Sequence, residues 1–487
     1  MLRFCSYLYN YIQLILSVRN YIHVYERTSD HNIVLLDNII QRISSCGSVA
    51  IKFCQWVTPK LELIYTEENE LLNKDRIKPL WLRKLETFYE NCDNHSIDYT
   101  IEEYETIFHE NFNETYEILE IIGSGSIGQV YLIQDKPLKD YTTSKKYVMK
   151  IMHPNVKYDI RFFRRFYSFL TWIPCINNEF KTNFPFDIHQ FIKQFEQQSD
   201  FLQESNHLLQ FHEFYKDNNS IIIPKLVKTS ETIMIMSYEE GISYEESTLN
   251  KHEKYKLAML FGLFTRNNQH ILNYNHGDLH KGNWKIMEDK INQNHKLVIY
   301  DFGFCWSVPR DKHHLIELSS VFEDSDRNPK KIDSDNLSDI LFSLVVYNKE
   351  DKTEFKERVN DYVKENIIET QVWSLSPLKL FKLSVELCVS EDILIDPVMI
   401  QTIIVSLQCQ LLFQETGLQS TATNEISSLE VYRGRYLDML TFCKTKNIFH
   451  DYQENMIHKL NDKQTKVEGV FDFIDMPDSI KQLALNK

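Results

Sequence analysis

The spacing of hydrophobic residues predicts helices over the first part of the chain. The hydrophobic residues that recur at intervals of three and four are Leu35, Leu36, Ile39, Ile40, Ile43, Leu61, Ile64, Leu71 and Leu72. Such intervals place apolar side chains on one face of a helix. Residues 1–110 are therefore expected to form a mostly helical segment.

From Tyr116 onward the hydrophobic runs become short, which is typical of strands. The runs that predict strands span residues 116–122, 129–133, 146–152, 231–237 and 296–300. After about residue 310 the spacing is helical again. Strands followed by helices in one continuous unit, without an internal repeat, predict an α+β fold.

One further helix is predicted between the third and fourth of these runs. The residues expected to form its buried stripe are Phe191, Phe195, Leu202 and Leu209. The alternative for this segment is an amphipathic helix on the solvated surface.

Composition and charge exclude several classes of protein. Hydrophobic residues make up 43% of the chain and charged residues 25%, which excludes a disordered chain and a polytopic membrane protein. The net charge of −15 disfavours nucleic-acid binding, which requires a basic surface. The nine cysteines are scattered and form no metal-binding spacing, so they predict free thiols in an intracellular, reducing compartment.

The N-terminus contains an uncharged, aromatic-rich stretch between Phe4 and Val18. At about 15 residues it is shorter than the roughly 20 that a membrane span needs. Two interpretations stay open for residues 1–25. They form a helix that packs on the rest of the protein, or they form a membrane-surface or organelle-targeting (mitochondrial) helix.

A glycine motif lies between the first two predicted strands. The segment Gly123-Ser-Gly-Ser-Ile-Gly-Gln-Val130 has the form G-x-G-x-x-G-x-V. Rossmann folds use such glycines between a strand and a helix, whereas kinases use them in a turn between two strands. A strand-like run follows Gly128, and about 20 residues on the chain carries Lys150 in place of an acid. Both observations favour the kinase interpretation.

Three further motifs follow in the order found in kinases. Lys150 lies in the third predicted strand, where kinases carry the lysine that pairs with the α- and β-phosphates. The segment His276-Gly-Asp-Leu-His-Lys-Gly-Asn283 has the D-x-x-x-x-N spacing of the catalytic loop. Asp278 is therefore the expected catalytic base. Asn283 and Asp301, the latter in Asp301-Phe-Gly303, are the expected metal ligands.

Together these motifs resemble the UbiB, or aarF-domain-containing (ADCK), atypical kinase family over roughly residues 45–310. The resemblance implies a bilobal protein-kinase-like fold, with a helical N-terminal extension over the active site and a largely helical C-terminal lobe. The implied divisions are an extension over residues 1–110, an N-lobe over 111–241, a C-lobe over 242–450 and a tail over 451–487. Members of the family are linked to coenzyme Q and other isoprenoid lipid metabolism.

The most diagnostic part of the resemblance precedes the glycine motif. Lys52 and Gln55 match the family's K-x-G-Q signature, with Cys54 in place of its glycine. At a spacing of three residues, Lys52 and Gln55 share a helix face. The segment from Gln198 to Glu204 resembles the family's E-x-D segment and the glutamate that follows it, with Gln198 in place of the first glutamate.

The resemblance also assigns roles within that segment. Glu204 is the implied partner of Lys150. Asp200, expected on the same helix face as Glu204, is placed opposite Lys52. Two further departures are Lys281, where the family has proline, and the Gly-Ser-Gly-Ser loop, where many members have alanines. The segment Met236-Ser-Tyr-Glu-Glu-Gly241 resembles the hinge that contacts adenine, and an A-P-E segment for peptide substrates is absent from the sequence.

The leading prediction is an ATP- and Mg²⁺-dependent atypical kinase or ATPase of this family. Besides Lys150 and Glu204, the residues expected to bind the nucleotide are Ile122, Gly123, Ser124, Gly125, Ser126, Gly128 and Val130. An isoprenoid lipid or a membrane is an expected further partner, and the phosphate acceptor is left open. Two alternatives stay open: a small-molecule phosphotransferase of the aminoglycoside or choline type, and an ATP-binding regulatory pseudokinase.

Overall fold

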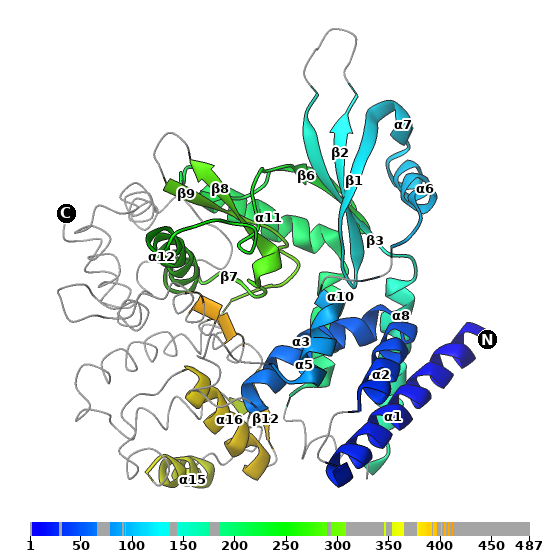
Figure 1. Ribbon diagram of the computed structural model, residues 1–487, viewed down its shortest axis with the longest axis vertical. Coiled ribbons are helices and arrows are strands. Elements are labelled where there is room, and N and C mark those ends of the chain that lie inside the picture. Colours follow the sequence, from blue (N-terminus) through cyan, green and yellow to red (C-terminus); the bar gives the residue numbers. More distant parts are fainter. Residues whose placement is uncertain are drawn as a thin grey trace, which may run out of the picture. The chain divides into compact units, whose positions relative to one another are not determined.

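The computed structural model describes most of the first 307 residues and part of the remainder (Figure 1). The described residues are 2–28, 32–65, 78–89, 92, 94–136, 144–174, 186–289, 294–307, 345–346, 353–364, 377–391, 393–396, 401, 404–405, 408–409 and 412. The predicted tail over residues 451–487 lies outside them.

The chain divides into two compact units, which are described separately. The first contains residues 1–179, 188–206 and 225–238, and the second contains residues 180–187, 207–224 and 239–487. Both helices and strands occur in each unit, so the predicted α+β class is confirmed.

The first unit contains a five-stranded antiparallel sheet (Figure 1). Its strands, in spatial order, are β1 (Tyr116–Ser124), β2 (Gly128–Asp135), β3 (Lys146–Met152), β6 (Ile233–Ser237) and β5 (Leu226–Thr229). Four of the five correspond to hydrophobic runs in the sequence. The exception is β5, whose four residues are too few to show an alternating pattern.

The two faces of this sheet have different surroundings. The helices α6 (Ile97–Phe108) and α7 (Phe112–Thr115) contribute Tyr104 and Phe112 to a buried cluster that also contains Met149 and Ile151 of β3. Because side chains alternate along a strand, Lys150 lies on the opposite face from Met149 and Ile151. The position of Lys150 in β3 therefore places its side chain on the face of the sheet away from the apolar cluster.

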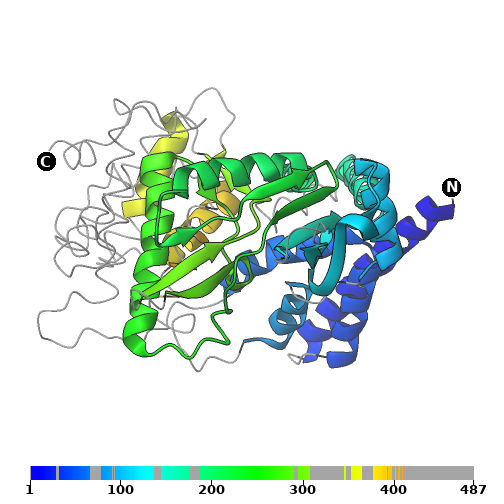
Figure 2. The ribbon, with the colours of Figure 1, turned by 90° about the horizontal axis from the view of Figure 1, so that it is seen from above.

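The other described elements of the first unit are helices, as the spacing predicted for residues 1–110; Leu71 and Leu72 lie outside the described residues. They are α1 (Leu2–Thr28), α2 (Ile33–Ser45), α3 (Ser48–Tyr65), α5 (Leu80–Glu86), the 3₁₀ helix η1 (Thr87–Tyr89), α8 (Val156–Thr171), α10 (Ile188–Gln198) and the start of α11 (Phe201–Tyr215). The neighbouring helices α1 and α2 lie side by side in both views (Figure 2). The predicted helical spacing is present in α2, whose buried residues are Leu36, Ile39 and Ile43.

A buried carboxylate fixes α1 and α3 to α8. Asp159 of α8 is 6% exposed and accepts hydrogen bonds from the Tyr7 hydroxyl of α1 (2.5 Å) and the Ser48 hydroxyl of α3 (3.0 Å). Each bond to a charged acceptor contributes roughly 1.5–3 kcal/mol. The opposite side of α1 is exposed, and none of the described helices is both long enough and apolar enough to cross a membrane.

The second unit contains a small sheet and a two-stranded pair. The sheet consists of β4 (Ile221–Ile222), β9 (Asn294–Ile299) and β8 (Trp284–Asp289), and the pair consists of β7 (Asn275–His276) and β10 (Cys305–Trp306). Of these, only β9 was predicted. The helix α12 (Lys251–Asn267), followed by a π-helical turn over Asn268–Leu272, supplies Phe261, which contacts Trp284.

Beyond residue 310 the described elements are mostly helical, as predicted. They are α15 (Thr353–Val363), α16 (Pro377–Glu391) and the short antiparallel pair β11 (Val345–Val346) and β12 (Leu394–Ile395).

Candidate active site

The glycine motif forms the turn between β1 and β2. The amide of Gly125 donates to the carbonyl oxygen of Gly128 at 3.0 Å, which closes the turn. A Cβ atom on Gly128 would lie 2.5 Å from the carbonyl oxygen of Ile151, whereas Cβ atoms on Gly123 and Gly125 would meet open space or an ordinary contact. Gly128 is therefore required for the packing of β2 on β3. Packing does not require glycine at positions 123 and 125, so these two glycines serve another role.

This difference predicts that alanine at Gly128 lowers stability and that alanine at Gly125 does not. Gly128→Ala should lower the free energy of unfolding by about 1–3 kcal/mol, because β3 must move to admit the methyl group. Gly125→Ala, the matched control, should leave stability unchanged within about 0.5 kcal/mol. Urea unfolding of both variants gives the comparison. Equal losses would contradict the packing role of Gly128.

The helix α3 contacts the tip of the glycine turn. The hydroxyl of Ser126 donates to Oε1 of Gln55 at 3.1 Å, and Nε2 of Gln55 donates to the carbonyl oxygen of Phe88 at 2.7 Å. Cys54, which replaces the family's glycine, is buried in the cluster that joins α2, α3 and α8. Burial raises the pKa of its thiol to about 12. The cysteine therefore serves packing, and the sequence departure has a structural reason.

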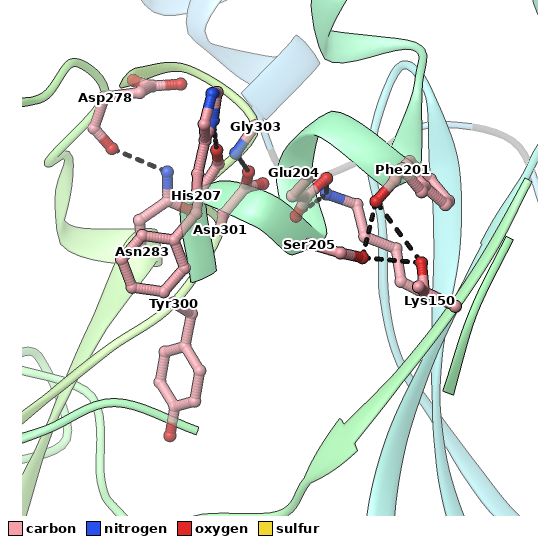
Figure 3. Close-up of polar contacts among 12 residues, drawn as sticks. Lys150, Phe201, Glu204, Ser205, His207, Asp278, Asn283, Tyr300, Asp301 and Gly303 are labelled. Atoms are coloured by element: carbon pink, nitrogen blue, oxygen red, sulfur yellow. Dashed lines mark hydrogen bonds and ion pairs between the residues drawn. The ribbon is translucent and has the colours of Figure 1, made fainter. Parts of the chain in front are cut away.

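Lys150 and Glu204 form a buried ion pair within the first unit (Figure 3). Nζ of Lys150 lies 2.8 Å from both carboxylate oxygens of Glu204. The two side chains are 12% and 1% exposed, and the ring of Phe201 lies 5.1 Å from Nζ. The pairing expected from the sequence is present. Val130 lies opposite Lys150 in the β2–β3 register, beside the glycine turn.

The start of α11 is fixed by polar contacts on both sides of Glu204. The carboxylate of Asp200 accepts from the Leu202 amide at 3.0 Å, as an N-terminal helix cap does. The hydroxyl of Ser205 lies 2.6 Å from the carbonyl oxygen of Phe201 and 2.6 Å from the hydroxyl of Thr229 in β5. These contacts hold Glu204 in place before any ligand binds.

The prediction of one continuous helix through this segment is wrong in part. The segment forms two helices, α10 and α11, which are separated at Ser199 and Asp200. Phe191 and Phe195 are buried as predicted, but Leu202 and Leu209 are 40% and 47% exposed.

The break in the helix changes which side chains face inward. In α11 the buried aromatic and aliphatic residues are Phe201, Leu208, Phe211, Phe214 and Tyr215. Asp200 caps α11 and does not share a regular helix face with Glu204, which corrects that expectation as well. The sequence carried a signal for the break, because Ser-Asp before an apolar residue is typical of a helix start. Gln198 ends α10 and is buried, and whether Asp200 faces Lys52 stays a prediction.

The catalytic-loop motif lies in the second unit and is organised by His276. This side chain is buried, Nε2 donates to the carbonyl oxygen of Tyr300 (2.9 Å), and Nδ1 accepts from the amide of Asp278 (3.2 Å). Burial lowers the pKa of His276, so the ring is neutral and both nitrogens match their partners. The sequence contained this histidine within a recognised motif but did not reveal its positioning role.

Asn283 holds the same loop from its other end. The side-chain amide nitrogen of Asn283 donates to the backbone carbonyl oxygen of Asp278 at 2.7 Å. The backbone carbonyl oxygen of Asn283 accepts from the backbone amide of Tyr300 at 2.8 Å. The Asp278 backbone is thus fixed by Asn283 and His276, while its side chain is 39% exposed. A carboxylate on a fixed backbone at this exposure can accept a proton from, or orient, an incoming hydroxyl or water.

Asp301, the predicted metal ligand, adopts a strained backbone conformation. Its φ angle is +52°, in the left-handed region that few non-glycine residues adopt. Its carboxylate accepts from the Gly303 amide at 3.2 Å. The next residue, Phe302, is buried, and its carbonyl oxygen lies 2.8 Å from Nδ1 of His207. Such strain occurs at functional sites, where the surrounding structure maintains it.

The donor set at Asn283 and Asp301 suits magnesium. Because the amide nitrogen of Asn283 is turned toward Asp278, the amide oxygen is the end that can face a cation. Mg²⁺ is bound through one or two protein oxygens together with waters and substrate phosphates. Within the described residues, groups of three or more His, Cys, Asp or Glu that could hold a metal are absent.

Comparisons with known proteins place the chain beside atypical kinases in sequence. The family model of the ABC1 atypical kinase-like domain matches residues 88–332. A probable serine/threonine-protein kinase, abkC, from Dictyostelium discoideum is 26% identical over 313 residues, which cover 61% of this chain and 42% of the relative. The chain thus matches less than half the length of that relative.

Two solved structures resemble the chain more distantly. The Rv3197–erythromycin complex from Mycobacterium tuberculosis is 15% identical, with a TM-score of 0.38, and the match covers 62% of this chain and 81% of that one. The Rio2 kinase complex with ADP/Mg²⁺ and phosphoaspartate from Chaetomium thermophilum is 12% identical, with a TM-score of 0.28, over 72% and 98% of the two chains.

Proposed function

Because the chain belongs to the ABC1 atypical kinase-like family, we propose that it is an ATP- and Mg²⁺-dependent phosphotransferase or ATPase. The observation that carries this proposal is the buried ion pair between Lys150 and Glu204. A lysine in this strand, held by a helix glutamate, orients the α- and β-phosphates in kinases. An ordinary surface lysine would not be 12% exposed beside a carboxylate that is 1% exposed.

Each residue set has a role in the proposed reaction. The amides of the glycine turn approach the phosphates, since Gly123 and Gly125 place no side chain in the way. Asn283 and Asp301 would hold Mg²⁺, which when bound neutralises charge on the β- and γ-phosphates. Asp278 orients the attacking hydroxyl or water and accepts its proton at a carboxylate oxygen. Positioning and charge neutralisation account for most of the catalysis in such reactions.

A finer proposal concerns the family subgroup and its setting. Lys52 and Gln55 support the UbiB type, for which the resemblance implies a link to isoprenoid lipids. The exposed side chains of Tyr9, Ile12 and Leu16 on α1 support association with an intracellular membrane surface, such as a mitochondrial one. We therefore propose that lipids regulate the activity or supply its substrate.

An ATP-hydrolysis assay with and without vesicles tests both levels of the proposal. The full chain with Mg²⁺ should release phosphate from ATP, and anionic vesicles that contain a polyprenyl lipid should change the rate. Asp301→Asn, which removes the proposed metal ligand, is the negative control. Tight ATP binding without turnover would favour a regulatory pseudokinase instead. Phosphorylation of small alcohols with no vesicle effect would favour a small-molecule phosphotransferase.

A further inference from the structure

Two histidines that belong to none of the kinase motifs meet beside the glycine turn. His95 precedes α6 and His153 follows β3, and their Nδ1 atoms lie 2.7 Å apart although the residues are separated by 58 positions. Nε2 of His153 lies 3.0 Å from the carbonyl oxygen of Gly125. Nε2 of His95 lies 2.9 Å from the hydroxyl of Thr100, which in turn lies 2.7 Å from the hydroxyl of Tyr131.

The chemistry of the Gly125 end fixes the direction of these hydrogen bonds. A carbonyl oxygen only accepts, so Nε2 of His153 carries the proton and, in the neutral ring, Nδ1 accepts. Nδ1 of His95 therefore donates to His153, and Nε2 of His95 accepts from Thr100. The Thr100 hydroxyl, having given its proton to His95, accepts from Tyr131.

The other end of the network imposes the same direction. The backbone amide of His95 donates to Oε1 of Gln129 at 2.9 Å, which turns the amide nitrogen of Gln129 toward the hydroxyl oxygen of Tyr131 at 2.8 Å. Tyr131 thus accepts from Gln129 and donates to Thr100. Gln129 and Tyr131 are both fully buried, so the network is anchored in the sheet.

The bond at Gly125 controls which way one peptide group faces. In a trans peptide the carbonyl group of one residue and the amide of the next point in opposite directions. With the Gly125 carbonyl directed at His153, the Ser126 amide is directed away from His153. Glycine permits both orientations of this peptide group more readily than other residues. A carbonyl turned the other way would present a negative dipole to a phosphate.

We propose that His153 is a positioning residue that selects the phosphate-binding orientation of the Gly125–Ser126 peptide, and that His95 keeps His153 in the required tautomer. This inference rests on the proposed function, because it assumes that the glycine turn receives nucleotide phosphates. It assigns to two residues outside the motifs a role in nucleotide affinity.

Two isosteric variants separate the donor from the acceptor of His153. His153→Gln keeps an N–H group near the position of Nε2, whereas His153→Asn keeps a polar group near Nδ1 and loses the donor to Gly125. Mg²⁺-ATP titrated calorimetrically into the full chain should bind His153→Asn about tenfold more weakly than wild type, as expected for one lost hydrogen bond. His153→Gln should stay within about twofold. Equal affinities of all three proteins would overturn the proposal.

Measurements without nucleotide keep this result distinct from the proposed function. Amide hydrogen exchange over residues 123–128 should accelerate in His153→Asn and not in His153→Gln, with melting temperatures that show both fold. Nitrogen NMR of labelled histidines should find the Nε2–H tautomer at His153 and the Nδ1–H tautomer at His95. If wild type binds no ATP, the proposed function fails. These two measurements still test whether His153 donates a hydrogen bond to the carbonyl oxygen of Gly125. The reverse tautomers, or unchanged hydrogen exchange in His153→Asn, would overturn the positioning role of His153.

The network also predicts a dependence of stability on pH. The titratable rings that face His95 are those of His153, Tyr99 and Tyr131. Burial, followed by the proximity of His153, lowers the pKa of His95 from its ordinary 6.5 to about 4. The unfolded chain therefore takes up a proton between these values, and the free energy of unfolding falls as the pH falls from about 6.5 to about 4. His95→Asn should make this fall smaller, and an unchanged slope would contradict a neutral His95.

Discussion

Asp278→Asn is expected to lower the rate of ATP turnover by about 10²- to 10⁴-fold while the protein remains folded. The side chain of Asp278 is 39% exposed, and its backbone is fixed by His276 and Asn283 rather than by the carboxylate. The change therefore removes a proton acceptor and leaves the loop contacts in place. Phosphate release from ATP gives the rate, and the melting temperature should shift by no more than about 2 °C.

A matched variant separates this effect from a general loss of negative charge. Asp361 lies on α15 in the same unit and is 72% exposed. Asp361→Asn should leave both turnover and melting temperature unchanged. Full turnover by Asp278→Asn would show that Asp278 is not the catalytic base, and unfolding of the variant would contradict the claim that His276 and Asn283 fix the loop.

Glu204→Ala is expected to have the largest effect on stability, a loss of about 3–5 kcal/mol in the free energy of unfolding. The Glu204 side chain is 1% exposed, and its removal leaves the ammonium group of Lys150, whose side chain is 12% exposed, without the carboxylate at 2.8 Å. An unpaired charge in such a place costs more than the pair itself contributes. Urea unfolding measures the loss, and turnover should fall with it because Lys150 is no longer held.

A double variant tests whether the charge is the cause. Lys150→Met combined with Glu204→Leu removes both charges and should recover most of the stability, as apolar replacements of buried ion pairs do. It should remain inactive, because the phosphates have lost their lysine. A double variant as unstable as Glu204→Ala would show that the loss comes from packing around α11 and not from an unpaired cation.

Much of the first unit could be predicted because its signals are local. The run Lys146–Met152 is apolar apart from its two lysines and forms β3 with those same bounds. The pairing of Lys150 with Glu204 followed from a motif together with the family resemblance, since an ammonium group in an apolar strand needs a partner. The roles of Asp278, Asn283 and Asp301 come from spacing alone, and they stay predictions that the experiments above address.

The features that were missed depend on contacts between distant segments or on very short elements. β7 and β10 have two residues each, so a pattern cannot form in them. His95 and His153 are 58 positions apart, and only the folded sheet brings their rings together. The break between α10 and α11 does not show in the hydrophobic pattern, because the apolar residues on either side of Asp200 fit one helical period although the helix cap interrupts the helix.

The hydrogen bond between Ser126 and Gln55 joins the glycine turn to α3 at 3.1 Å. Linkage requires that such a contact act equally in both directions. A ligand whose binding strengthens this bond also tightens α3 against the turn, and anything that pulls α3 away weakens the ligand by the same factor. One hydrogen bond of about 1 kcal/mol limits that factor to roughly fivefold. Through Gln55, ligand binding at the glycine turn and the position of α3 are therefore thermodynamically coupled. A ligand that binds the turn changes how firmly α3 is held, and a partner that moves α3 changes the affinity of the turn for its ligand.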